Sequence, residues 1–241
     1  MVKLNDLKDP DAFYVLFTGA WNLPDSDSWL RTKSRTRSKK SVKKIGGRMR
    51  KDVQYTVKKV AEAGLGLITG LGLGIDTEAI KTFLRYGDHN KIIAISPVSV
   101  DNYSDHYADS WEKRGIISRA QVEELHELLY KSIPQNRIFD SSRFRNVNQD
   151  SYYERDSKEV KIADIVFGFH LDDTGGTGDT LNKARAAGIP TYVKRYTADN
   201  EGWTGRFKAD SYNLPASLKG WQNRLKGINH LVKERSQYKS N

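Results

Sequence analysis

The sequence predicts an α/β protein built on a parallel sheet with helices on both faces, together with a basic loop and a C-terminal appendage. Three observations lead to this prediction. Strand-like runs alternate with helical periodicities, the strand-like runs are apolar throughout, and glycine clusters follow two of them. Strands that are apolar on both faces are typical of parallel sheets covered by helices on both sides.

The first half of the chain contains three expected strands and two expected helices. Residues 12–18, 65–69 and 91–96 are β-rich and apolar, which predicts buried strands. Apolar residues recur at helical spacing between them: Val53, Val57, Val60 and Ala61 before Gly64, and Ala79, Ile80, Phe83 and Leu84 before Gly87. A glycine directly after such a pattern is a usual helix end.

The second half opens with a long excursion over residues 98–148, in which one helix is well marked. Ser118 and Gln121 form a capping box there, and Ile117 and Val122 have the spacing of a hydrophobic staple. The later elements are a helix at 151–162, a strand at 165–170, a helix that carries Leu181 and Ala184, and a strand at 191–195. We expect one domain over residues 1–195, with a basic insertion at 31–51 and an appendage at 196–241.

Composition excludes several classes of protein. The 241 residues include no cysteine, which excludes a disulfide scaffold, a cysteine nucleophile and a zinc-finger site. The N-terminus lacks the apolar segment of a signal peptide, and no run approaches the roughly 18 apolar residues of a membrane span. We therefore expect a cytoplasmic protein with no membrane partner, no metal and no cofactor.

The net charge of +10 is concentrated in one stretch. Residues 31–51 hold eleven cations and no acid: Arg31, Lys33, Arg35, Arg37, Lys39, Lys40, Lys43, Lys44, Arg48, Arg50 and Lys51. The first half of the stretch has few large apolar residues, so we expect a mobile loop there. A nucleic-acid partner fits such a run, because neutralising phosphates releases counterions. The competing interpretation is a solvated loop that aids solubility.

A second, weaker basic zone lies in the appendage. Residues 219–241 hold six cations against Glu234 alone, and aromatic residues such as Trp203, Phe207 and Trp221 stand between nearby cations. Aromatic rings beside cations suit single-stranded nucleic acid. The same rings would equally serve to pack the appendage onto the main domain.

Two glycine clusters stand between a strand and a helix: Gly70, Gly72 and Gly74, and Gly175, Gly176 and Gly178. Ligands of parallel α/β sheets bind at the carboxyl ends of the strands, where helix N-termini favour anions. Thr177 and Thr180 add hydroxyl groups to the second cluster. The two clusters together favour phosphate binding over simple tight turns, although neither has the spacing of a Walker or dinucleotide loop.

The same segments resemble a known family. Gly70-Leu-Gly-Leu-Gly-Ile-Asp76, the run Ala163 to Phe169, Gly175-Gly-Thr-Gly-Asp-Thr-Leu181 and Lys183 to Pro190 resemble segments of the DNA-processing-A (Smf) and Lonely-guy superfamily of Rossmann-like domains. The resemblance covers about residues 12–195. It implies a Rossmann-like fold, phosphate-binding roles for Gly19 after the first strand and for Arg155, and DNA binding. The sequence lacks the proline and the glutamate of the Lonely-guy glycine motif.

Two function classes remain, with a third interpretation beside them. The leading hypothesis is a DNA-binding protein that holds phosphates on both glycine loops, with affinity from the basic stretch. The sequence leaves open whether the DNA is single- or double-stranded and whether the protein forms a homo-oligomer. The alternative is an N-glycosidase, with Asp76, Glu78 or Asp179 as the catalytic carboxylate, although Asp76 and Asp179 also suit helix N-caps. A sensor of a small nucleotide would use the same loops without chemistry.

Overall fold

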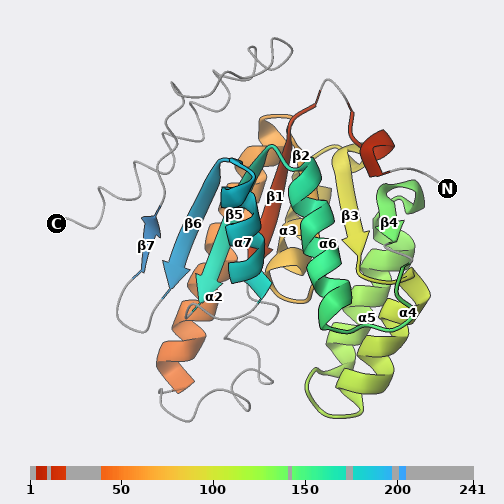
Figure 1. Cartoon of the computed structure of the whole chain (residues 1–241). Coiled ribbons are helices and arrows are strands. Elements are labelled where there is room, and N and C mark those ends of the chain that lie inside the picture. The colour runs from red at the N-terminus through yellow and green to blue at the C-terminus, as the bar shows by residue number, and fades with distance from the viewer. Residues whose placement is uncertain are drawn as a thin grey trace.

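A computed structural model of the chain describes residues 4–9, 12–19, 39–140, 143–171, 176–196 and 201–204. Its centre is a seven-stranded sheet in the order β4-β3-β2-β1-β5-β6-β7 (Figure 1). The strands are β1 (Tyr14–Gly19), β2 (Gly66–Thr69), β3 (Ile92–Ser96), β4 (Ile138–Asp140), β5 (Ile165–Leu171), β6 (Thr191–Tyr196) and β7 (Glu201–Thr204). Strands β1 to β6 pair in parallel, and β7 pairs antiparallel with β6. The α/β fold class predicted from the sequence is confirmed.

Helices cover both faces of the sheet (Figure 1). One face carries α2 (Lys39–Glu62), α3 (Ile75–Tyr86), α4 (Val100–Asp105) with its π-helical continuation η3 (His106–Glu112), and α5 (Arg119–Glu127) with its continuation η4 (Leu128–Ser132). The other face carries α6 (Gln149–Ile162), α7 (Gly176–Ala186) and the short 3-10 turn η1 (Leu4–Leu7). Two further 3-10 turns, η2 (His89–Lys91) and η5 (Gln135–Arg137), precede β3 and β4.

The strands divide their side chains between two cores. In β1, Val15 and Phe17 belong to the core under α2 and α3, whereas Tyr14 and Leu16 belong to the core under α6 and α7. This division follows from the two-residue repeat of a strand, which sends successive side chains to opposite faces. Both sets are fully buried, which explains why β1 is apolar at four successive residues.

The structure adds elements that the sequence did not predict. Beside the predicted α5 with its Ser118–Gln121 capping box, the excursion at 98–148 contains α4 with its π-helical continuation η3 and the edge strand β4. The sheet also continues past residue 195, because Tyr196 ends β6 and β7 follows it.

The second half of the basic insertion is helical, since α2 begins at Lys39, while the loop expected over its first half lies outside the described residues. Across the described ranges, no helix has both the length and the apolar character of a membrane span.

Candidate functional site

The predicted site lies at the carboxyl edge of the sheet, where the strand order reverses between β1 and β5. Such a switch point is the usual ligand position of a doubly wound sheet. The first glycine loop follows β2 and leads into α3, and α7 begins at Gly176 just after β5. Gly175 and the segment 20–38 after β1 lie outside the described residues.

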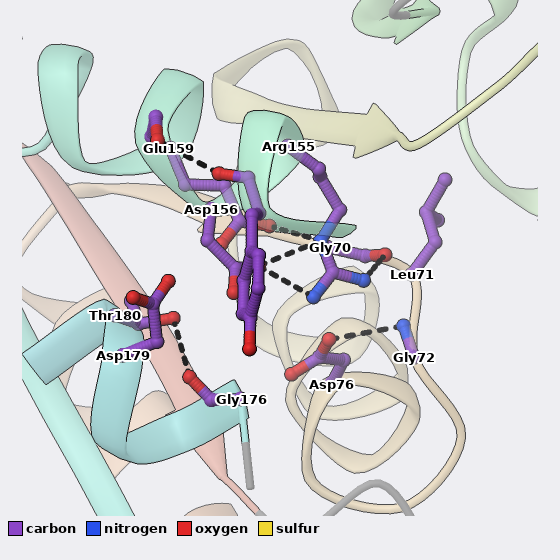
Figure 2. Close-up of polar contacts among 12 residues, drawn as sticks. Gly70, Leu71, Gly72, Asp76, Arg155, Asp156, Glu159, Gly176, Asp179 and Thr180 are labelled. Carbon is purple, nitrogen blue, oxygen red and sulfur yellow. Dashed lines mark hydrogen bonds and ion pairs between the residues drawn. The ribbon is translucent and has the colours of Figure 1, made fainter. Parts of the chain in front are cut away.

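The backbone of the loop at 70–74 is hydrogen-bonded to side chains of the same protein. The amide of Gly72 donates to Oδ2 of Asp76 at 2.9 Å, and its carbonyl accepts from the Thr77 hydroxyl at 3.0 Å. The carbonyl of Leu71 accepts from the Tyr103 hydroxyl at 3.3 Å. From the sequence we expected this backbone to bind a phosphate. In the structure the Gly72 amide instead donates a hydrogen bond to the carboxylate of Asp76 (Figure 2).

Glycine is required in this loop for steric reasons. A Cβ placed on Gly70 would meet Cζ of Arg155 at 2.7 Å, with Oε1 of Glu159 closer still. Gly74 has a φ of 92°, in the region that side chains disfavour. Gly19 packs in the same way, because its Cβ would lie 2.8 Å from Cβ of Ile75. Close packing therefore accounts for Gly70 and Gly19, and backbone conformation for Gly74.

Arg155 is the centre of a buried charge cluster. Its side chain is 14% exposed, and its guanidinium lies 2.7 Å from Oδ1 of Asp156 and 3.4 Å from Oε1 of Glu159. It also donates to the carbonyl of Gly70 at 3.0 Å, which joins α6 to the loop after β2 (Figure 2). Asp156 and Glu159 are both buried. The arginine that the resemblance assigned to a phosphate is thus engaged by two carboxylates.

The pKa values of two acids at this cluster, Asp76 and Glu159, are raised. Burial raises the pKa of Asp76 to about 6, against the lowering effect of Arg155 and the Gly72 amide. Burial likewise raises the pKa of Glu159 well above its ordinary value, against the attraction of Arg155. Removal from water disfavours the charged form of an acid, which is the physical cause of both shifts.

The second glycine cluster has a different character. Within the part of the chain that the structure describes, a Cβ on Gly178 would meet nothing within 4 Å, and one on Gly176 would meet only Oδ2 of Asp156, at 3.7 Å. These residues open α7, whose first-turn N–H groups have no partner within a helix. The Thr180 hydroxyl donates to the carbonyl of Gly176 at 3.1 Å, and Thr177 is buried. The open feature of this turn is therefore its backbone.

The three candidate catalytic carboxylates do not converge. Glu78 lies between α3 and α2, where it accepts from Gln54 at 2.6 Å and pairs with Arg50 at 3.1 Å. Asp179 pairs with Lys183 one turn further along α7, at 2.6 Å. Only Asp76 stands beside the Arg155 cluster, and the N-cap residue of α3 is Gly74. The structure thus separates the three acids into three environments.

The predicted DNA-binding residues are described in part. Arg31, Lys33, Arg35 and Arg37 lie outside the described residues, while Lys39, Lys40, Lys43 and Lys44 form the first turns of α2. The N-terminal end of α2 lies on the side of the molecule toward which the parallel strands point, where the glycine loops also lie (Figure 1). The basic stretch therefore reaches the predicted ligand edge.

Sequence reasoning missed the partners of Arg155. Glu159 stands one helical turn after it, a spacing that pairs opposite charges on a helix and could have predicted the contact. Asp156, the next residue along α6, left no comparable signal, because adjacent residues of a helix do not usually face each other. Tyr103, which donates to the carbonyl of Leu71, left none either, because this contact depends on how the excursion packs against the first glycine loop.

Comparison with known proteins places the fold. No protein-family model matches the sequence, and no curated protein matches it. A structure of DNA processing protein A from Helicobacter pylori, reported for its single-stranded DNA binding mode, has a TM-score of 0.51 and 16% identity over 92% of this chain and 81% of that chain. DNA processing protein A (DprA) from Streptococcus pneumoniae has a TM-score of 0.43 and 13% identity over 90% of this chain and 56% of its own. The chain described here has the fold of DNA processing protein A from Helicobacter pylori.

Proposed function

We propose that this protein binds DNA, in single-stranded form, along the carboxyl edge of its sheet. The observation that carries the proposal is that the basic N-terminal end of α2 and the open first turn of α7 lie at the same edge (Figure 1). The structural neighbour from Helicobacter pylori is described by its single-stranded DNA binding mode, and this supports the choice of ligand.

The first turn of α7 is the proposed phosphate site. Gly176 and Gly178 let a phosphate approach the backbone closely, and the helix dipole favours its charge. The carboxylate of Asp156 lies nearby, but Arg155 offsets its charge at 2.7 Å. The loop at 70–74 would line the site without binding the phosphate through Gly72, because the Gly72 amide is hydrogen-bonded to Asp76. The phosphate of a free nucleotide would compete for the same turn.

Gly176→Val tests the phosphate site. Among the described residues, the only neighbour of a Cβ at this position is 3.7 Å away, so we expect valine to leave the fold intact while it covers the backbone that a phosphate would contact. We expect an unchanged Tm and an oligonucleotide affinity about tenfold lower, the loss of one charge-assisted contact. Ala186→Val, on an exposed site at the other end of α7, is the matched control. Unchanged affinity in Gly176→Val contradicts the site.

Charge reversal tests the basic end of α2. Changing Lys39, Lys40, Lys43 and Lys44 to glutamate should abolish binding at moderate salt and reduce the dependence of affinity on salt. The control reverses four cations of the excursion, Lys113, Arg114, Arg119 and Lys131, and so carries the same net charge. Equal losses in the two variants would mean that net charge, not α2, drives the association.

An N-glycosidase activity is a second candidate, favoured by one observation. Asp76 has a pKa of about 6, so it could donate or accept a proton near neutral pH beside the Arg155 guanidinium. We expect base release from DNA or nucleoside monophosphates to be measurable by mass spectrometry and to stop in Asp76→Asn. DNA binding without base release from either substrate would leave the binding function alone.

A further inference from the structure

The outer face of α2 carries a regular basic stripe. Lys51 and Lys58 are seven residues apart, which places them on the same side of the helix, about 10 Å apart along its axis. Lys44 falls in the same register one further repeat toward the N-terminus. Val53 and Val57 face the opposite way, into the core. The stripe therefore runs from the ligand edge of the sheet toward its other edge.

An exposed aromatic ring stands at the far end of the stripe. Tyr86, the last residue of α3, is 45% exposed, and the Lys58 ammonium lies 4.8 Å from the centre of its ring. The two helices run side by side in the same direction, because Arg50 in the middle of α2 pairs with Glu78 near the start of α3, and Lys58 contacts Tyr86 eight residues further along each helix. Arg85, beside Tyr86, is also exposed.

One acid moderates this surface without cancelling it. Glu62 lies 3.7 Å from the Lys58 ammonium and 2.8 Å from that of Lys59, so it offsets one charge at the end of the stripe. Lys51, Lys58, Lys59 and Arg85 are four cations against this one carboxylate. A polyanion that also offers flat rings is complementary to cations arranged around an exposed tyrosine.

We propose that a single-stranded nucleic acid continues from the sheet edge along the outer face of α2, with its phosphates near Lys51 and Lys58 and one base stacked on Tyr86. Lys58 holds the ring by its cation–π contact and stands where the phosphate of the stacked nucleotide would lie. A duplex would not offer an unpaired base to this ring. The inference rests on the proposed function and extends it to a second surface, in which Lys58 of α2 and Tyr86 of α3 are in contact.

Oligonucleotides of two lengths test the proposal in the full chain. One has about 6 nucleotides, near the lower end of the usual 4–16 nucleotides of a single-strand site, and the other has about 30, well beyond its upper end. Lys51→Glu with Lys58→Glu should weaken the binding of the long oligonucleotide. It should also reduce the slope of log affinity against log salt concentration by about 1.4, at about 0.7 for each lost phosphate contact. The short oligonucleotide should bind as before. Lys113→Glu with Lys131→Glu carries the same charge change and should leave both unaffected.

Tyr86 is tested separately. Tyr86→Ala should lower the affinity for the long oligonucleotide about tenfold, and Tyr86→Phe, which keeps the ring, should leave the affinity unchanged. A long oligonucleotide that carries 5-iodouracil should crosslink to Tyr86 under ultraviolet light, with the site located by mass spectrometry. If wild type binds neither length, the proposed function itself fails. If wild type binds but the α2 and Tyr86 variants match it, or if both double variants lose equally, this second surface is refuted.

Discussion

Asp76 shows how one side chain decides the character of a glycine loop. Its carboxylate accepts the Gly72 amide at 2.9 Å, which is the kind of donor that a bound phosphate would use. The loop thus contains its own anion, and the Arg155 cluster closes over Gly70 beside it. The loop after β2 is braced by the protein's own charges, whereas the first turn of α7 has no such carboxylate on its amides among the described contacts.

The raised pKa of Asp76 has a consequence for stability. The folded protein binds the proton at a pKa of about 6, and the unfolded chain at about 3.8, so stability falls as the pH rises through this interval. Above pH 6 the ionised carboxylate of Asp76 lowers the free energy of unfolding by about 1–2 kcal/mol. This is less than the full pKa shift implies, because the residue is only half-buried and water screens part of its charge.

Asp76→Asn removes this charge. We expect it to stabilise the protein by about 1–2 kcal/mol at pH 8 and by much less at pH 4, measured by urea unfolding. A gain that is equal at both pH values, or a loss at pH 8, would contradict the assignment of the shift to Asp76.

At the scale of elements, α2 is fixed to the sheet by a buried ion pair. The Lys194 ammonium of β6 lies 2.6 Å from Oδ2 of Asp52, and the Tyr196 hydroxyl donates to the same oxygen at 2.8 Å. All three residues are buried. Asp52 is the first residue after the eleven cations, so the acid that ends the basic stretch is also the point where the helix is held against the molecule.

Lys194→Met should destabilise the protein by about 3–5 kcal/mol, because it leaves the Asp52 carboxylate buried without its cation. Asp52→Asn should cost a similar amount, and the double variant clearly less than the sum of the two. Urea unfolding of the four proteins gives the coupling directly. Additive losses would show that Asp52 and Lys194 stabilise the fold independently of each other.

At the scale of the whole molecule, the residues of the two cores and the basic residues of the appendage occupy different parts of the chain. Among the described residues, the last to join either core is Tyr196. Residues 205–241, outside the described ranges, carry eight cations against two acids. We propose that this part of the appendage contributes charge to nucleic-acid binding and little to the stability of the sheet.

A chain that ends at Thr204 should therefore keep its Tm within a few degrees and lose affinity for single-stranded DNA. The dependence of the affinity on salt should also become weaker. Thermal unfolding and fluorescence anisotropy at two salt concentrations provide the measurements. Failure of the shortened chain to fold would show that the appendage completes the core, which is the alternative role for its aromatic residues.

The sequence by itself determined the layered α/β architecture, since the uniformly apolar runs and the glycine stops are local signals of buried parallel strands and helix ends. It also determined the concentration of charge before Asp52 and the capping box of α5. The short edge strands β4 and β7 stayed hidden, because three or four residues carry too little periodicity to be recognised.

Only the tertiary structure distinguished the surroundings of the two glycine loops. Both clusters follow a strand and precede a helix, so their sequences predict the same phosphate-binding role. The structure distinguishes them through contacts between residues far apart in the chain: Arg155 and Glu159 close over Gly70, and nothing described covers Gly178. Which side chain fills the space above a backbone depends on helix packing across the whole sheet, and no local pattern of residues records it.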